Sequence, residues 1–208
     1  MIRVHPPDPV TSPRSEQSGT LSFAWILVLL LLGAGYRLAV PVFDLPWNSA
    51  PLMAMAFGGS MMLGVRFWWL PVAVFLVGDL LLGLRNPAEG VAGYTLMSAV
   101  VYGFVAFIGA RAARSLKIWP MMWCGTLLCS VLFYGVGNTY TWLAWPGYEK
   151  TLAGWWQSQT TGLPEYAPQA WVFLKNSLIA DTIWCALAGI VYAVSRRPLA
   201  VPAAEPAR

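Results

Sequence analysis

The chain has 208 residues, of which 58% are hydrophobic and only 11% are charged, and its formal net charge is +4. Soluble domains carry about 25% charged residues, so this composition excludes an ordinary soluble globular protein. The basic residues are scattered to the ends of apolar blocks, which excludes a nucleic-acid-binding patch and is typical of membrane topology.

Six apolar blocks follow a polar N-terminal segment, and each is predicted to be a membrane-spanning helix. About 20 helical residues cross a hydrocarbon core of about 30 Å. Residues 1–20 are rich in Pro, Ser and charge and predict a disordered cytoplasmic tail. The predicted helices cover residues 21–40, 51–65, 67–84, 91–110, 119–142 and 171–194, and residues 196–208 predict a second cytoplasmic tail.

The predicted fold class is therefore all-α, an integral membrane six-helix bundle over residues 21–195 with both termini in the cytoplasm. Such a chain is a multi-pass protein of the cell inner membrane or plasma membrane, and the lipid bilayer is its first partner.

The positions of Lys and Arg set this orientation, because cytoplasmic loops carry the excess of both residues. With six crossings and the N-terminus inside, the predicted cytoplasmic residues are Arg3, Arg14, Arg66, Arg111, Arg114, Lys117, Arg196, Arg197 and Arg208. Only Arg85 and Lys150 fall in outside loops. If the short second block were re-entrant, the basic cluster at residues 111–117 would face outward, so the block is predicted to be a span.

The first apolar block leaves a second interpretation open. Its apolar core is followed by Gly33, Ala34 and Gly35, which resemble the small-residue cleavage site of a secretory signal. The polar leader is long for such a signal and Arg37 follows immediately, so the sequence favours a retained helix over a cleaved one.

Ionisable side chains inside the predicted spans mark a candidate site. A charged side chain in a spanning helix costs about 2.5–3.5 kcal/mol on insertion scales and usually faces the bundle interior or a cavity. The residues of this kind are Arg37, Asp79, Lys175 and Asp181. Counted from the helix ends, all of them fall in the outer half of the membrane.

Neutral polar residues gather at the same depth, in the stretch 134–141 of the fifth block and at Asn48 before the second. We therefore expect a pocket that opens to the outside and holds a small-molecule ligand. The predicted substrate-binding residues are Asn48, Asp79, Asn138, Lys175, Asn176 and Asp181.

A structural role for the same charges stays open. Asp79 or Asp181 can pair with Arg37 or Lys175 and fix the bundle. The side chains of Arg37 and Lys175 can also reach the lipid headgroups. Lys175 and Asp181 are six residues apart, about 240° around a helix, so these two do not share a face.

The last outside loop, residues 146–168, contains an apolar helical pattern. Tyr148, Leu152, Trp155 and Trp156 recur at the spacing of one helix face. We expect an interfacial helix there, which serves either as a lid over the pocket or as a packed surface helix.

Enzyme and metal motifs are absent from the sequence. His5 is the only histidine, and no glycine-rich phosphate loop with a following lysine occurs. Cys124, Cys129 and Cys185 lie in apolar segments without metal-ligand spacing. We expect no catalytic residue, no bound metal and no cofactor.

The run of residues 48–59, Asn-Ser-Ala-Pro-Leu-Met-Ala-Met-Ala-Phe-Gly-Gly, resembles the signature of an uncharacterised family of small bacterial membrane proteins. That family is commonly likened to the substrate-binding (S) components of energy-coupling-factor vitamin transporters. Segments 71–83, 148–154 and 176–181 resemble further parts of it, and the resemblance covers roughly residues 37–192.

The resemblance implies a six-helix fold that takes up a small, vitamin-like molecule from outside. It also implies a transmembrane coupling protein and ATPases as partners. S components usually contact the coupling protein through small residues at four-residue spacing in the first helix, and the cytoplasmic half of this first block lacks such a pair. The alternative function is a non-transporting structural or assembly membrane protein whose charges are paired internally.

Overall fold

A computed structural model describes residues 14–85, 93–112, 118–165 and 168–195, and within them the fold is all-α, without a β-strand. The elements are α1 (Arg14–Ala39), the π-helix η1 (Ala54–Gly59), α2 (Ser60–Leu63), α3 (Trp69–Arg85), α4 (Gly93–Ala112), α5 (Ile118–Ala144), α6 (Leu152–Gln159) and α7 (Ala170–Ser195). The prediction of an all-α fold is confirmed.

Three of the described helices are long and apolar enough to cross a membrane, namely Gly93–Ala112, Trp119–Ala144 and Ala170–Val191. Shorter apolar helices cover Phe23–Ala39, Ala54–Leu63 and Trp69–Leu84. Large apolar side chains on the outside of the bundle are exposed, among them Leu96 on α4, Leu128 on α5 and Ile190 on α7.

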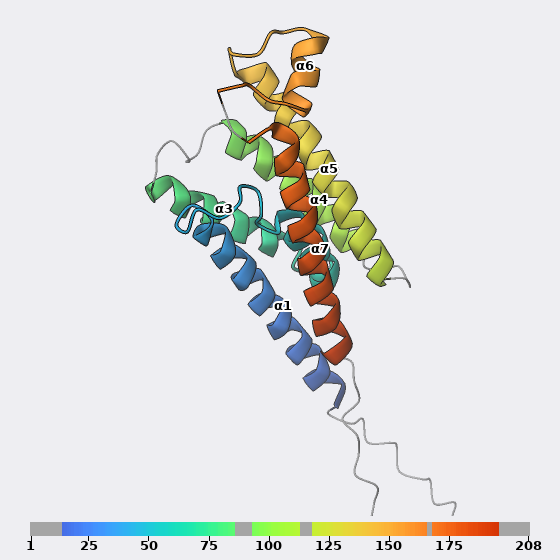
Figure 1. Cartoon of the computed structure of the whole chain (residues 1–208). Coiled ribbons are helices and arrows are strands. Elements are labelled where there is room, and N and C mark those ends of the chain that lie inside the picture. The colour runs from blue at the N-terminus through green and yellow to red at the C-terminus, as the bar shows by residue number, and fades with distance from the viewer. Residues whose placement is uncertain (1–13, 86–92, 113–117, 166–167, 196–208) are drawn as a thin grey trace, which may run out of the picture.

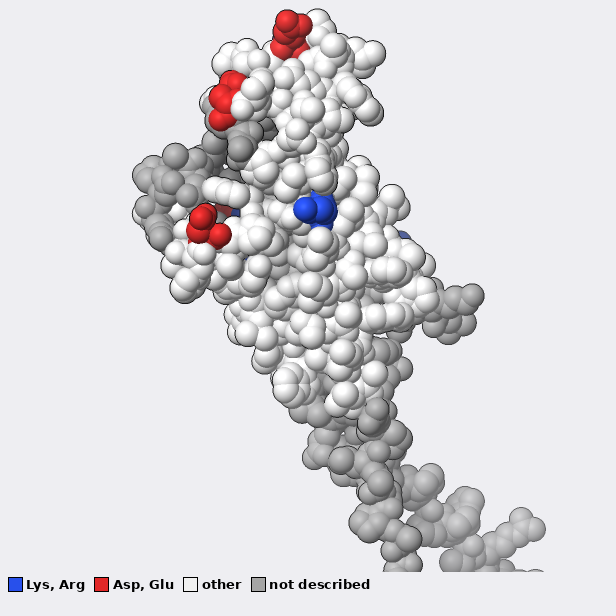
Figure 2. Space-filling view, viewed as in Figure 1, with Lys and Arg blue, Asp and Glu red and all other residues white. Residues whose placement is uncertain are grey.

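The surface of the bundle is also apolar, as a membrane environment requires. Figure 2 shows a face almost without charged side chains along the helices, with the visible acidic residues in the half of the molecule that carries α6. Water does not solvate such a face well, whereas lipid does.

The N-terminal prediction needs one correction. Residues 14–20, predicted as part of a disordered tail, are the first turns of α1. Extending an existing helix costs far less than nucleating one, and the apolar helix that follows supplies the nucleus. The rest of the predicted tails, residues 1–13 and 196–208, lies outside the described residues, as do Arg114 and Lys117.

The second apolar block forms the centre of the bundle. It folds into the six-residue η1 and the four-residue α2, and η1 contacts α1, α3, α4, α5 and α7. Met53, Ala56 and Phe57 are buried there. Ten helical residues rise only about 15 Å, so this helix is shorter than the hydrocarbon core is thick.

Glycines let the neighbouring helices approach this centre. A Cβ atom on Gly109 of α4 would overlap the backbone of Phe57, and one on Gly125 of α5 would overlap the ring of Phe57. The small residues of η1 and the glycines facing it therefore replace the long side chains that would hold helices apart.

Two ends of the bundle can be distinguished. In Figure 1 the start of α1 and the end of α7 lie at one end, and α6 lies at the other. Aromatic contacts tie further elements to the first end. Phe23 of α1 packs on Phe67 at a ring distance of 5.1 Å, and Trp68 packs on Phe107 of α4 at 5.7 Å. The connection between α2 and α3 therefore lies beside the start of α1.

The α6 end is closed by contacts between loops and helices. The amide of Asn176 on α7 donates to the Trp47 carbonyl at 2.9 Å. The rings of Tyr94 on α4 and Tyr140 on α5 pack edge to face at 6.1 Å. The loop before η1, the start of α4, the end of α5 and the start of α7 thus meet around one space.

Candidate functional site

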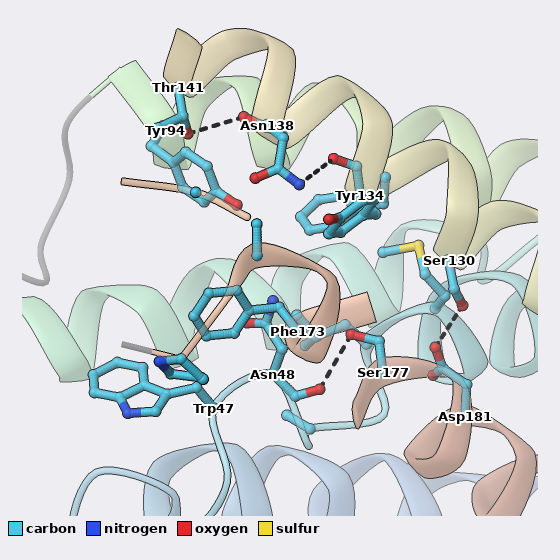
Figure 3. A pocket seen from close by; sticks show the side chains of 18 of the residues that line it. Trp47, Asn48, Tyr94, Ser130, Tyr134, Asn138, Thr141, Phe173, Ser177 and Asp181 are labelled. Carbon is cyan, nitrogen blue, oxygen red and sulfur yellow. Dashed lines mark hydrogen bonds between the residues drawn. The ribbon is translucent and has the colours of Figure 1, made fainter. Parts of the chain in front are cut away.

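That space is a cavity of about 460 Å³ between α5, α7 and the loop that precedes η1 (Figure 3). Small-molecule sites have volumes of about 300–1,000 Å³. The aromatic residues of its lining are Trp47, Tyr94, Phe133, Tyr134, Trp145, Tyr148 and Phe173. The side chains that bring oxygen or nitrogen atoms besides these rings are Asn48, Ser130, Asn138, Thr141, Ser177 and Asp181.

One face of α5 supplies most of the polar lining. Ser130, Tyr134, Asn138 and Thr141 are spaced by three or four residues, which places them on the same side of a helix. Figure 3 shows them following one another along α5. This stretch thus presents a polar stripe to the cavity, although the rest of α5 is apolar.

A matching face of α7 forms the opposite wall. Ala170, Phe173, Ser177 and Asp181 follow the same three- and four-residue spacing. Lys175 lies between them on another face, and its ammonium group stands 5.6 Å from the Trp171 ring centroid. The aromatic contact explains how a lysine is accommodated outside the cavity.

The loop before η1 is held in place by α7. Asn48 adopts a left-handed backbone conformation, with φ of 57°, which asparagine tolerates better than most residues. The hydroxyl of Ser177 donates to the Asn48 carbonyl at 3.2 Å, next to the bond from Asn176 to the Trp47 carbonyl. Asn176 therefore positions the cavity wall without lining the cavity.

Asp181 and Ser130 form the inner end of the cavity. The Asp181 carboxylate accepts a hydrogen bond from the Ala54 backbone N–H at 2.9 Å and lies 2.6 Å from the Ser130 hydroxyl. Ala54 is the first residue of η1, whose free N–H groups and positive dipole end favour a carboxylate. Asp181 thus caps the central helix while it lines the cavity.

Asp79 is occupied elsewhere. It forms an ion pair with Arg37, which joins α3 to α1, and it is absent from the cavity lining. The Arg37 guanidinium also lies over the Phe75 ring, 5.0 Å from its centroid. This pair holds the bundle together beside the cavity.

The segment around α6 forms part of the rim. Tyr148, Leu163 and Pro168 line the cavity, whereas the residues of α6 itself do not. α6 packs on α5, where the Trp155 indole N–H donates to the Thr139 hydroxyl at 3.0 Å. Burial raises the pKa of the Tyr148 hydroxyl above its ordinary value.

Exposure shows which end of the cavity is open. Trp47 is 55% exposed and Trp145 is 47% exposed, whereas Ser130 is 2% and Asp181 is 1% exposed. The cavity therefore runs from an aromatic rim at the α6 end to a buried polar floor beside η1.

The predicted binding residues divide into two groups. Asn48, Asn138 and Asp181 line the cavity, and Asp79, Lys175 and Asn176 do not. Sequence reasoning missed Trp47, Tyr94, Ser130, Phe173 and Ser177. The spacing of Phe173 and Ser177 relative to Asp181 would have identified the last two, because all three share one helix face.

The described residues contain no group of three or more His, Cys, Asp or Glu side chains that could hold a metal ion. Cys124, Cys129 and Cys185 are free thiols. The arrangement offers aromatic faces and hydrogen-bonding groups, which suit the binding of a small molecule.

A protein-family model described as a family of unknown function, DUF6580, matches residues 17–203. Because the match covers most of the chain, the protein belongs to this family. No curated protein and no solved structure matches it.

Proposed function

We propose that this member of the DUF6580 family is a membrane protein that captures a small molecule from outside, in the manner of an energy-coupling-factor S component. The observation that carries the proposal is the cavity, which has an aromatic rim, polar walls and a buried floor. Small-molecule sites combine apolar and aromatic walls with a few placed polar groups in this way.

Six crossings with both termini in the cytoplasm form part of the proposal. Its support is that the start of α1, the α2–α3 connection, the end of α4 and the end of α7 gather at one end of the bundle. Arg66 and Arg111 belong to this end, which the positive-inside rule assigns to the cytoplasm. The cavity rim then faces the outside of the inner or plasma membrane.

The proposal extends to a transmembrane coupling protein and ATPases that would drive uptake. Small residues usually line such helix contacts. The exposed residues Trp25, Val28 and Leu32 of α1 are bulky. We therefore expect a coupling protein that binds α1 to contact these bulky side chains rather than small residues. Capture of the ligand does not require this partner.

A thermal-shift screen of the detergent-purified protein against vitamins, their precursors and related metabolites tests capture. A ligand at about 100 times its dissociation constant stabilises its protein by about 2.7 kcal/mol. A ligand should raise the melting temperature of the wild type, and Ser177→Phe, which fills the cavity, should abolish the shift.

The matched control is Ile179→Phe, which adds an aromatic ring to the exposed outer face of the same helix. It should respond to the ligand as the wild type does. A ligand that stabilises Ser177→Phe as strongly as the wild type binds outside the cavity and removes the support for the proposal.

The second candidate is a structural or assembly protein without a ligand, and the Arg37–Asp79 ion pair favours it. In that case the polar groups of the cavity serve only to position helices. No metabolite would then raise the melting temperature of a well-folded preparation. We infer no catalytic role for either candidate.

A further inference from the structure

Three hydroxyl groups of the cavity walls donate their protons to the protein itself. Thr141, Ser177 and Tyr134 each donate to a backbone carbonyl, at 3.0, 3.2 and 2.5 Å respectively. A hydroxyl has one proton and two lone pairs, so each of these groups faces a ligand as an acceptor.

The floor of the cavity is also rich in acceptors. The Ser130 hydroxyl lies between the Thr126 carbonyl at 2.9 Å and the Asp181 carboxylate at 2.6 Å, and it has only one proton to donate. The Asn138 amide donates to the Tyr134 carbonyl at 3.1 Å. On the stripe of α5 that faces the ligand, the second N–H of Asn138 therefore remains as a donor, and the other groups named here offer acceptor oxygens.

The charge of the lining has one sign. Among the described residues that line the cavity, Asp181 is the only acidic side chain and no lysine, arginine or histidine occurs. A buried anionic ligand would find no counter-charge there, which is unfavourable in a desolvated site. A cationic ligand would instead be complementary to the carboxylate of Asp181.

The aromatic walls favour the same kind of ligand. Figure 3 shows Trp47 and Phe173 on one side of the cavity and Tyr94 and Tyr134 on the other. Rings of this kind stack on flat ligands and attract cations to their faces. Walls of this composition suit a flat aromatic body.

The geometry points to a flat aromatic cation as the ligand, one that donates hydrogen bonds from a positively charged nitrogen group to the acceptors of α5 and α7 and to Asp181. This inference rests on the proposed capture function and specifies its substrate class.

Three probes with one ring system separate charge from shape: naphthalene-2-carboxamidine, naphthalene-2-carboxamide and naphthalene-2-carboxylate. Their dissociation constants are measured at pH 7 on the full-length protein in detergent by ligand-dependent melting. We expect the amidinium to bind more tightly than the carboxylate by about tenfold or more. The neutral amide should lie between the two.

Two variants locate the preference. Asp181→Asn keeps an acceptor for the Ala54 N–H and removes the charge, so the advantage of the amidinium should fall by about tenfold. Glu149→Gln makes the same chemical change in the exposed loop and should leave all dissociation constants unchanged. If Asp181→Asn does not fold, the ranking of the probes on the wild type still decides.

The outcomes are distinct for the two proposals. If the carboxylate binds as tightly as the amidinium, the cationic class is overturned while small-molecule capture stands. If no probe binds but a metabolite that is not an aromatic cation shifts the wild type and fails to shift Ser177→Phe, the class is again overturned alone. If neither probes nor metabolites bind to well-folded protein, both proposals fall.

Discussion

Asp181 joins the core of the bundle to the cavity, since its carboxylate caps η1 and contacts Ser130. The two roles depend on different properties of the side chain. Capping needs an acceptor oxygen, which asparagine also supplies, whereas electrostatic attraction of a ligand needs the charge.

We therefore predict that Asp181→Asn melts close to the wild type, while Asp181→Ala is less stable by about 1–3 kcal/mol. The alanine variant leaves the part-buried Ala54 N–H without its partner. Thermal unfolding in detergent measures both. Equal destabilisation by the two substitutions would show that capping does not explain the position.

For the Arg37–Asp79 ion pair, we predict that removing both partners costs less stability than removing one. Arg37→Leu leaves the Asp79 charge buried without its partner and should lower stability by about 3–5 kcal/mol. Replacing both residues with leucine should recover most of that loss, because no charge then remains buried. If the loss of stability in the double variant equals the sum of the losses in Arg37→Leu and Asp79→Leu measured singly, the two residues do not act as a pair.

At the residue scale, the sequence identifies the ionisable side chains within the apolar helices but does not predict which of them face one another. Asp79 and Asp181 are alike by depth, yet only Asp181 faces the cavity, because Asp79 points to Arg37. The rotation of one helix against another depends on packing around η1. Ser130 and Ser177 escaped notice because single hydroxyls are ordinary in membrane helices.

At the scale of elements, η1 depends on close backbone approach. We predict that Gly109→Ala destabilises the protein, since the added methyl group overlaps the Phe57 backbone. Gly103→Ala is the matched control on the same helix, where no atom lies within 4 Å of an added Cβ. It should be neutral or stabilising by about 0.5–1 kcal/mol.

Unfolding in detergent compares the two glycine variants under the same conditions. If Gly109→Ala is as stable as Gly103→Ala, α4 and η1 lie further apart than described.

The long helices could be predicted from the length of the apolar segments. A long apolar segment satisfies its backbone N–H and C=O groups without water by forming a helix. The π-helix could not be read in this way. Its wider i→i+5 hydrogen-bond pattern results from tertiary packing of Ala54–Gly59 against helices that include α1, α3, α4, α5 and α7, and no local propensity encodes it. The early start of α1 does not follow from the sequence, because residues 14–20 are polar and predict a continuation of the disordered tail.

At the scale of the whole molecule, the proposed topology predicts where reporters function. Green fluorescent protein fused to the C-terminus should fluoresce, since it folds in the cytoplasm. Alkaline phosphatase fused after Thr161, in the loop that follows α6, should be active only if that loop lies outside. Activity of a phosphatase fused at the C-terminus would contradict a cytoplasmic C-terminus.

The most direct test of the outward-facing cavity is the reaction of Ser177→Cys with a membrane-impermeant cationic thiosulfonate in right-side-out vesicles. The native cysteines are replaced by alanine, and Ile183→Cys on the exposed outer face of α7 is the control. We predict that the cysteine at position 177 reacts with reagent added outside, while the one at position 183, facing lipid, does not. Reaction at position 177 only from the inner side, or none, would contradict a cavity that admits small molecules from outside.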